Sequence, residues 1–344
     1  MKQKHVKITG NNIDFYLLKN HVILFSIRSS RLKAKKLAIM EAYFALSILN
    51  PIFIKNGPLG DLKGVFSFFV EKDRTDKLRD ILHKIGYCNK FYILDFDTDT
   101  LENLSDMSIK SKLIWKGKKF SIRNFFIQDE SIYKNQSPDK RKFIIKDSQN
   151  QEKKIYGYRG DGREFSRRAL PVEDARCLVN LSDYNFSNRL LDPFAGGGGI
   201  VYQAKYINKK KEVYSIDIDP TLAPGLLYYG SNHYTNDSSH ISFEDDFFDS
   251  IVTEVPFSSN ATVKIIKSIK NLHNSINMNG SLVIMSNREQ SLSIKEYVNH
   301  LGYHQYMSQK INRKGTGVVI MAWYKSYMKY KKIKGLLDVV EKIL

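Results

Sequence analysis

The stretch LLDPFAGGGGIVYQAKYI, residues 190–207, points most directly to the fold of this chain. An apolar pair leads into Asp192 and Pro193, four glycines follow at 196–199, and apolar residues then recur at helical spacing. Glycine adopts backbone conformations that other residues avoid and lets a ligand approach the main chain closely. The amides at the start of the following helix can bind such a ligand. The stretch therefore predicts a strand, a turn and a helix, and the turn is either a plain reversal or a ligand site.

The chain from residue 161 onward alternates between short apolar strands and amphipathic helices. The predicted strands lie at 189–192, 211–219, 240–243, 250–255, 281–286, 304–311 and 317–325. The predicted helices lie at 170–182, 198–207, 220–234, 260–276, 292–302 and, as a basic tail that packs on the body, 330–344. Such alternation indicates a mostly parallel sheet with helices on both faces. We expect a doubly wound, Rossmann-like α/β sheet whose last two strands form an antiparallel edge hairpin.

The first half of the chain has a different pattern and no catalytic cluster. Strands are predicted at 21–30, 64–72 and 90–97, with a short one near 51–54, and helices at 31–49 and 74–87. This order suggests a small α+β domain of ferredoxin-like type, with a role in binding or support. A strand pair is expected within 142–160 and a solvated loop at 131–142. The predicted domains are therefore 1–160 and 161–344.

The bulk composition favours a nucleic-acid partner in a reducing compartment. The 344 residues include 54 Lys and Arg against 36 Asp and Glu, a formal net charge of +18. Such an excess attracts polyanions, although compositional bias toward Lys, Ile and Asn would also produce it. Cys88 and Cys177 are the only cysteines, so neither a disulfide framework nor a cysteine zinc site is expected, and a cytoplasmic location fits. We predict no metal site and no membrane partner, and assign no oligomeric state.

Three predicted strands end in residues that suit a ligand site. In an open α/β sheet, ligands bind beyond the carboxyl ends of the strands. Asp192 and the glycines follow the first strand, Asp217 ends the second, and Glu254-Val255-Pro256-Phe257 end the fourth. Each feature taken alone also has an ordinary structural interpretation. The glycines could form a plain turn, Asp217 could be a solvated acid or a helix cap, and the segment after the fourth strand could simply pack in the core. A nicotinamide fingerprint, G-x-G-x-x-G, is not completed, because its last glycine falls on Tyr202, and no phosphate-binding G-x-x-x-x-G-K-[ST] is present.

Taken together, the successive motifs resemble those of a known enzyme family. LLDPFAGGGGI, VYSIDID and FDSIVTEVPF are similar to the motifs of class I S-adenosylmethionine-dependent amino-methyltransferases. The nearest group is that of the THUMP-associated tRNA guanine-N2 methyltransferases, and RRALPVEDARCLVNLS, residues 167–182, fits the helix that precedes its first motif. The resemblance covers roughly residues 163–325.

The resemblance implies S-adenosylmethionine as cofactor and assigns residues to it. It places Asp192, Gly196 and Gly198, after the first strand, against the methionine end of the cofactor, and it makes Phe194 a further cofactor-binding residue. Asp217 would hold the ribose, and Asp245 or Asp246 would lie near the adenine.

The family pattern at the end of the fourth strand is Asp or Asn, Pro, Pro, then Tyr or Phe. By this resemblance Glu254, Pro256 and Phe257 are the catalytic residues: an acceptor for the amine, a rigid turn and an aromatic ring that stacks on the base. Glu254 has one methylene more than Asp, and Val255 replaces the first proline. The implied reaction is methyl transfer to an exocyclic amine of a base, guanine N2 in tRNA or in another RNA. A catalytically degenerate RNA-binding protein and a DNA adenine amino-methyltransferase remain as alternatives.

Overall fold

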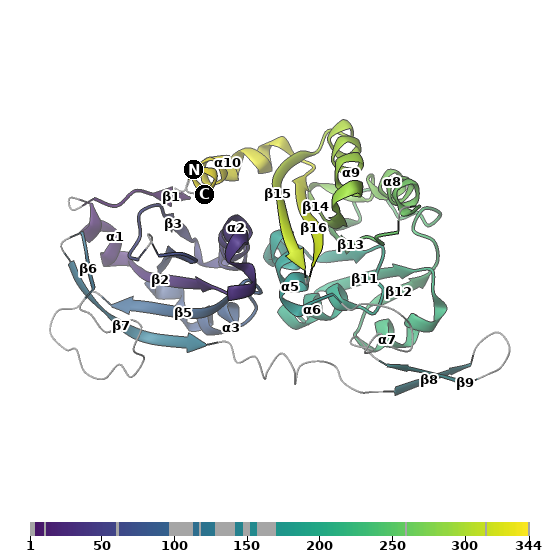
Figure 1. Cartoon of the computed structure of the whole chain (residues 1–344), viewed down its shortest axis with the longest axis horizontal. Coiled ribbons are helices and arrows are strands. Elements are labelled where there is room, and N and C mark those ends of the chain that lie inside the picture. Colours follow the sequence, from purple (N-terminus) through teal and green to yellow (C-terminus); the bar gives the residue numbers. More distant parts are fainter. Residues whose placement is uncertain are drawn as a thin grey trace. The chain divides into compact units, whose positions relative to one another are not determined.

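The computed structural model describes residues 4–9, 12–59, 62–95, 113–116, 118–127, 142–146, 152–156, 170–258, 260–313 and 315–342. The chain divides into two compact units, Met1–Gln128 together with Ile333–Leu344, and Asp129–Lys332 (Figure 1). The functional division into domains 1–160 and 161–344 stays a prediction. The resembling motifs all fall in the unit Asp129–Lys332.

A seven-stranded sheet forms the centre of the unit Asp129–Lys332. Its strands are β10 Arg189–Asp192, β11 Glu212–Asp217, β12 Asn232–Thr235, β13 Phe248–Glu254, β14 Ile276–Asn287, β15 His304–Arg313 and β16 Thr316–Tyr324. They lie in the order β12-β11-β10-β13-β14-β16-β15. The first five are parallel, whereas β16 runs antiparallel to both β14 and β15. The strand order reverses between β10 and β13, which is where open α/β sheets bind ligands.

Helices cover both faces of this sheet. They are α5 Val172–Leu181, α6 Gly199–Ile207, α7 Ala223–Tyr228, α8 Ala261–Leu272 and α9 Arg288–His300. Helices α5 and α6 pack together, as do α8 and α9, and the second pair places Ile265, Ile269 and Ile294 in the core beside strand residues such as Leu191 and Trp323. The predicted doubly wound sheet with an antiparallel edge hairpin is confirmed.

The third strand was wrongly expected at 240–243. That segment has no strand structure, and β12 lies at Asn232–Thr235, paired in parallel with β11. The predicted helix over 220–234 is shorter because Gly230, at φ +80°, ends α7 with its amide on the Leu227 carbonyl. A left-handed glycine closes a helix and turns the chain outward, so the next residues are available to a strand.

The unit that contains the N-terminus is also built on a seven-stranded sheet, in the order β1-β3-β4-β2-β5-β7-β6. These strands are β1 His5–Val6, β2 Asn20–Ile27, β3 Ile52–Ile54, β4 Val65–Glu71, β5 Cys88–Asp95, β6 Leu113–Trp115 and β7 Lys118–Ile127. The helices are α1 Ile13–Lys19, α2 Lys35–Ala45 and α3 Leu78–Leu82. The assignment of this unit to the ferredoxin-like class stays a prediction.

Two further segments have a defined structure. The strand pair expected within 142–160 is β8 Lys142–Lys146 with β9 Glu152–Tyr156, antiparallel; the loop expected at 131–142 lies outside the described residues except for its last residue. The basic tail forms α10 Tyr327–Glu341, which buries Ile333, Leu336 and Val340. Among the helices in the described parts of the chain, none has the length and hydrophobicity that a membrane span requires.

Candidate cofactor and amine site

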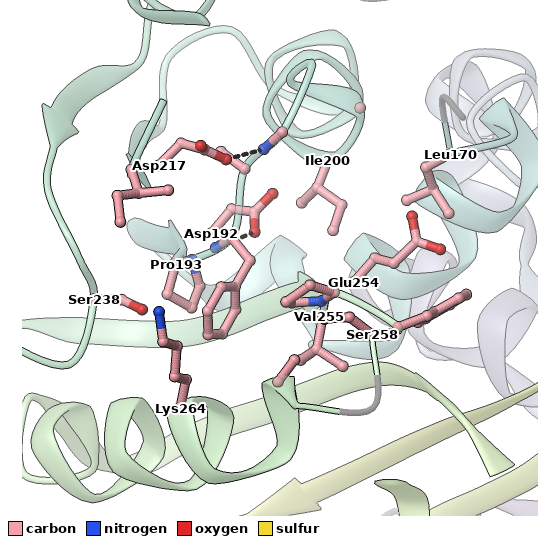
Figure 2. A pocket seen from close by; sticks show the side chains of 18 of the residues that line it. Leu170, Asp192, Pro193, Ile200, Asp217, Ser238, Glu254, Val255, Ser258 and Lys264 are labelled. Carbon is pink, nitrogen blue, oxygen red and sulfur yellow. Dashed lines mark hydrogen bonds between the residues drawn. The ribbon is translucent and has the colours of Figure 1, made fainter. Parts of the chain in front are cut away.

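A cavity of about 830 Å³ opens at the carboxyl ends of β10, β11, β12 and β13 (Figure 2). Three carboxylates from three neighbouring strands line it, and Asp192 lies between Asp217 and Glu254, as the order β11-β10-β13 requires. The other residues that line it come from the loops after these strands and from nearby elements: Leu170, Pro193, Phe194, Ala195, Gly196, Gly197, Gly199, Ile200, Ile218, Asn236, Asp237, Ser238, Val255, Pro256, Phe257, Ser258, Asn260, Ala261, Lys264, Arg313 and Thr316.

The glycine turn after β10 is held from the end of β11. The amide of Gly196 donates to Oδ2 of Asp217 at 2.8 Å, and the amide of Asp219 donates to Oδ1 at 2.9 Å. The amide of Ala195 also donates to the Ile216 carbonyl at 3.0 Å. Gly196 has φ +51°, and a Cβ added there would meet nothing within 4 Å, so its face of the turn is open to the cavity.

The last part of the turn starts the helix that follows. Gly198, at φ +84°, is the N-cap of α6, and an added Cβ would lie 3.0 Å from a methyl carbon of Leu226. Gly198 does not itself line the cavity. A cofactor contact at Gly198 stays a prediction. In this geometry Gly198 sets the path of the backbone that Gly196, Gly197 and Gly199 present to the cavity.

Asp192 is a buried carboxylate at the floor of the cavity. Its Oδ1 accepts hydrogen bonds from the Thr253 hydroxyl at 2.8 Å and from the Phe194 amide at 3.3 Å. Burial raises the pKa of Asp192 to about 7; the carboxylates of Asp217 and Glu254 add to this, and the two hydrogen bonds oppose it. A positively charged ligand group beside such a carboxyl would favour its ionised form and lower its pKa.

The loop after β12 supplies an acid that the sequence analysis did not select. Asp237 lines the cavity, and its Oδ1 accepts from the amide and the hydroxyl of Ser239, at 2.9 and 2.8 Å, which lowers its pKa. The side chain of Asn271 on α8 fixes this loop through the carbonyls of Ser238 and Ile241.

The two acids predicted near the adenine lie elsewhere. Asp245 and Asp246 are exposed in a turn before β13, and neither lines the cavity. They were selected because the third strand was placed eight residues too late. The signal that would have found Asp237 is Gly230, which ends the preceding helix early enough for a strand to finish at Thr235.

The end of β13 presents an ion pair rather than an isolated acid. Arg313, on the last residue of β15, donates from Nη1 to Oε1 of Glu254, and both side chains are largely buried. The guanidinium carbon also lies 5.5 Å from the centre of the Phe257 ring. Burial raises the pKa of Glu254, Arg313 opposes that rise, and Asp174 adds to it. Arg313 was missed because it belongs to the edge hairpin, 59 residues from Glu254.

The N-terminus of α9 holds the loop that follows Glu254. The side-chain amide of Gln290 donates to the carbonyls of Pro256 and Ser258, at 2.9 and 3.2 Å, and Asn287 donates to that of Phe257 at 3.1 Å. The same two residues form the capping box of α9. No described residue donates to the carbonyl of Val255, and Val255 is one of the residues that line the cavity.

The predicted site residues are thus largely brought together. The ones that line the common cavity are Asp192, Phe194, Gly196, Asp217, Glu254, Pro256 and Phe257. No group of His, Cys, Asp or Glu within the described ranges could hold a metal ion.

Two curated proteins are similar to part of this chain. The chain is 35% identical over 103 residues to the tRNA (guanine(10)-N2)-dimethyltransferase of Methanothermobacter thermautotrophicus, 28% of this chain and 30% of that one. It is 29% identical over 139 residues to a probable tRNA (guanine(10)-N2)-dimethyltransferase of Methanothermococcus thermolithotrophicus, 35% of this chain and 83% of that one. The chain thus spans less than a third of the first relative. No protein-family model matches it.

These relatives confirm the resemblance to class I S-adenosylmethionine-dependent methyltransferases. The unit Asp129–Lys332 has the doubly wound sheet with an antiparallel edge hairpin that was expected with this resemblance. Solved structures similar to the chain include TrmN from Thermus thermophilus, at 17% identity and a TM-score of 0.40, covering 49% of this chain and 53% of that one. The N-methyltransferase NodS from Bradyrhizobium japonicum, in complex with S-adenosyl-L-homocysteine, matches at 13% identity and a TM-score of 0.39, covering 48% and 92%. In this chain, the cavity lies where the strand order of the sheet reverses.

Proposed function

We propose that the chain binds S-adenosylmethionine in this cavity and transfers its methyl group to an exocyclic amine of a nucleic-acid base. The observation that supports this most strongly is the convergence of two loops on one cavity: the glycine turn held by Asp217, and the Glu254–Phe257 segment held by α9. The first suits a nucleoside cofactor and the second a planar amine. The relatives named above favour guanine N2 of tRNA as the target.

The residues present fit the cofactor. The cavity of about 830 Å³ is within the usual range of small-molecule sites, about 300 to 1,000 Å³. Asp192 would pair with the ammonium of the methionine moiety, beside the open face at Gly196. Asp217 would accept from the ribose, and Asp237, in place of Asp245 or Asp246, would accept from the adenine amine. When bound, S-adenosylmethionine supplies an electrophilic methyl group on its sulfonium.

The residues at the end of β13 would hold the acceptor base. The lone pair of an exocyclic amine is delocalised into its ring, so the amine needs help to attack. Oε2 of Glu254 and the carbonyl of Val255 are two acceptors for its N–H groups, and accepting from both would aim the lone pair toward the cofactor. The carboxylate stabilises the positive charge that develops on nitrogen and takes the proton that it loses. Phe257 would stack on the ring.

A nucleic-acid substrate is supported by charge. The net charge of +18 favours a polyanion, and we propose that the N-terminal unit binds RNA or supports the methyltransferase-fold unit.

Two experiments test the proposed function. Calorimetry with S-adenosylhomocysteine should show binding, and no binding at millimolar ligand would refute the cofactor assignment. Mass spectrometry of nucleosides from a strain that lacks the gene should show one methylated base lost from tRNA or another RNA. Cofactor binding without any lost methylated base in RNA would favour the degenerate or the DNA alternative. Glu254→Gln should keep cofactor affinity and lose transfer by about 100-fold or more.

A further inference from the structure

Glu254 has a structural partner that accounts for its extra methylene. A glutamate has one more torsion than an aspartate, so a free Glu254 carboxylate would sample more positions at the end of β13. In the structure, Nη1 of Arg313 donates to Oε1 of Glu254, and the Arg313 and Glu254 side chains are 11% and 19% exposed. A charge-assisted hydrogen bond in so enclosed a place restricts the carboxylate strongly.

The remaining contacts of Arg313 fix the arginine itself. Its Nη1 lies 3.7 Å from Sδ of Met285, which is paired in register with Glu254 on the neighbouring strand. Its guanidinium carbon lies 5.5 Å from the centre of the Phe257 ring. Arg313 therefore contacts both the predicted acceptor and the predicted stacking ring, while Oε2 of Glu254 has no hydrogen-bond partner among the described residues.

We propose that Arg313 is a positioning residue for methyl transfer: it holds Oε1 of Glu254 so that Oε2 is aimed at the amine of the acceptor base. This inference rests on the proposed function. In this proposal, Glu254 held by Arg313 accepts from the amine, as the shorter Asp or Asn does in the family pattern. The edge hairpin β15–β16 thereby contributes directly to the geometry of the site.

The electrostatics of the pair give this role a consequence that a purely structural arginine would lack. Burial raises the pKa of Glu254, Arg313 from β15 opposes this rise, and Asp174 from α5 adds to it. The charge of Glu254 in turn raises the pKa of Asp192 on β10. Without Arg313, the pKa of Glu254 should rise further and a protonated carboxyl would no longer accept from the amine.

The test compares Arg313→Ala, Arg313→Lys, Glu254→Asp and the double variant Glu254→Asp with Arg313→Ala. Lys310→Ala, an exposed cation on the same strand, is the matched control. Glu254→Asp withdraws the carboxylate by about 1.5 Å, one bond length, and so breaks the contact with Arg313. We expect Arg313→Ala and Glu254→Asp each to lower kcat about tenfold or more. The kcat of the double variant should lie within about threefold of that of the less active single variant, because both substitutions remove the same Glu254–Arg313 interaction.

The pH profile and the cofactor affinity separate the possible outcomes. Arg313→Ala should move the acid limb of kcat to higher pH, Arg313→Lys should restore most of it, and Lys310→Ala should match the wild type. The affinity for S-adenosylhomocysteine should be the same in all of these variants as in the wild type. If the wild type itself does not bind S-adenosylhomocysteine, the proposed function is refuted, and not the role of Arg313 alone. The positioning role is wrong if Glu254→Asp is as active as the wild type. It is also wrong if the fall in kcat of the double variant equals the product of the two single falls.

One readout does not depend on turnover. In protein labelled with ¹³C at the glutamate carboxyl, the Glu254 resonance is the one lost in Glu254→Gln. Its midpoint of titration should rise in Arg313→Ala and return toward the wild-type value in Arg313→Lys. An unchanged midpoint in Arg313→Ala would overturn the proposal even if no substrate has been found.

Discussion

The amide of Gly196 donates to Oδ2 of Asp217 at 2.8 Å, so the end of β11 holds the glycine turn that follows β10. The second oxygen of the same carboxylate accepts from Asp219. Asp217 thus has two tasks in the proposed site: its backbone contacts shape the turn, and its remaining lone pairs are directed to the ribose.

Asp217→Ala should weaken binding of S-adenosylhomocysteine by about tenfold or more, since a hydrogen bond to a charged group contributes roughly 1.5–3 kcal/mol. Calorimetry measures this directly. Asp219→Ala is the control: it loses the cap on Thr221 but keeps the carboxylate that holds Gly196. Equal losses in the two variants would contradict the specific role of Asp217.

The two left-handed glycines should separate stability from affinity. At Gly198, φ +84°, an alanine Cβ would lie 3.0 Å from Leu226, so Gly198→Ala should lower the free energy of unfolding by about 1–3 kcal/mol. At Gly196, φ +51°, the Cβ meets no protein atom and points to open space beside the cavity. Gly196→Ala should therefore cost less stability, about 1 kcal/mol, but more cofactor affinity. Thermal unfolding and calorimetry on the same pair would show whether this division holds.

Asp192 should make cofactor affinity depend on pH. Its pKa is about 7 in the cavity, and pairing with an ammonium requires the ionised form. Below pH 7, binding must release a proton, so the Kd for S-adenosylhomocysteine should rise by up to about tenfold per pH unit. Above pH 8 the Kd should level off. A Kd that does not change between pH 5.5 and 8 would argue against this pairing.

The Asp192 carboxyl should also make stability depend on pH: affinity for the cofactor rises with pH, whereas the contribution of this group to stability falls. The folded pKa of Asp192, about 7, lies above its unfolded value, so the folded state binds the proton more tightly. Stability from this group is therefore present at low pH and lost as the pH rises from about 4 to 7. Asp192→Asn should raise the Tm at pH 8 relative to the wild type and change it less at pH 5. The reverse order of the two effects would show that the carboxylate is stabilising.

Gln290 should influence transfer without touching the cofactor. It is buried, donates to the carbonyls of Pro256 and Ser258, and caps α9. Gln290→Ala should cost about 1–2 kcal/mol of stability and lower kcat, because the loop that carries Phe257 loses its support. Glu289→Ala, at the exposed neighbouring position, is the control. A fall in cofactor affinity that equals the fall in kcat would point to general unfolding of the site instead.

Substitutions can identify the acid that would accept from the adenine amine. Asp237→Ala should weaken binding of S-adenosylhomocysteine, whereas Asp245→Ala and Asp246→Ala should not, since only the first lines the cavity. Ser239→Ala removes one hydrogen bond to Asp237 but leaves the carboxylate in place, so it controls for loosening of the loop. Loss of affinity in Asp245→Ala would restore the assignment made from sequence.

The sequence predicted well wherever a local pattern carried the information. The stretch 190–207 is a strand, a glycine turn and a helix, because apolar spacing and left-handed glycines act over a few residues. The alternation of strands and helices was sufficient for a doubly wound sheet. The prediction failed at 240–243, where a single glycine, Gly230, ended a helix earlier than the periodicity suggested and moved the next strand.

By itself, the sequence determined the methyltransferase-like order of motifs and put Asp192, Asp217 and Glu254 at strand ends, since a parallel sheet brings those ends to one edge. Only the tertiary structure decided which other side chains meet them. Arg313 is 59 residues from Glu254 and lies on an antiparallel hairpin, and Gln290 is 34 residues from Pro256. Such contacts depend on strand order and register, which no local periodicity encodes, and they decide whether the altered Glu-Val-Pro-Phe motif has an oriented, ionised acceptor.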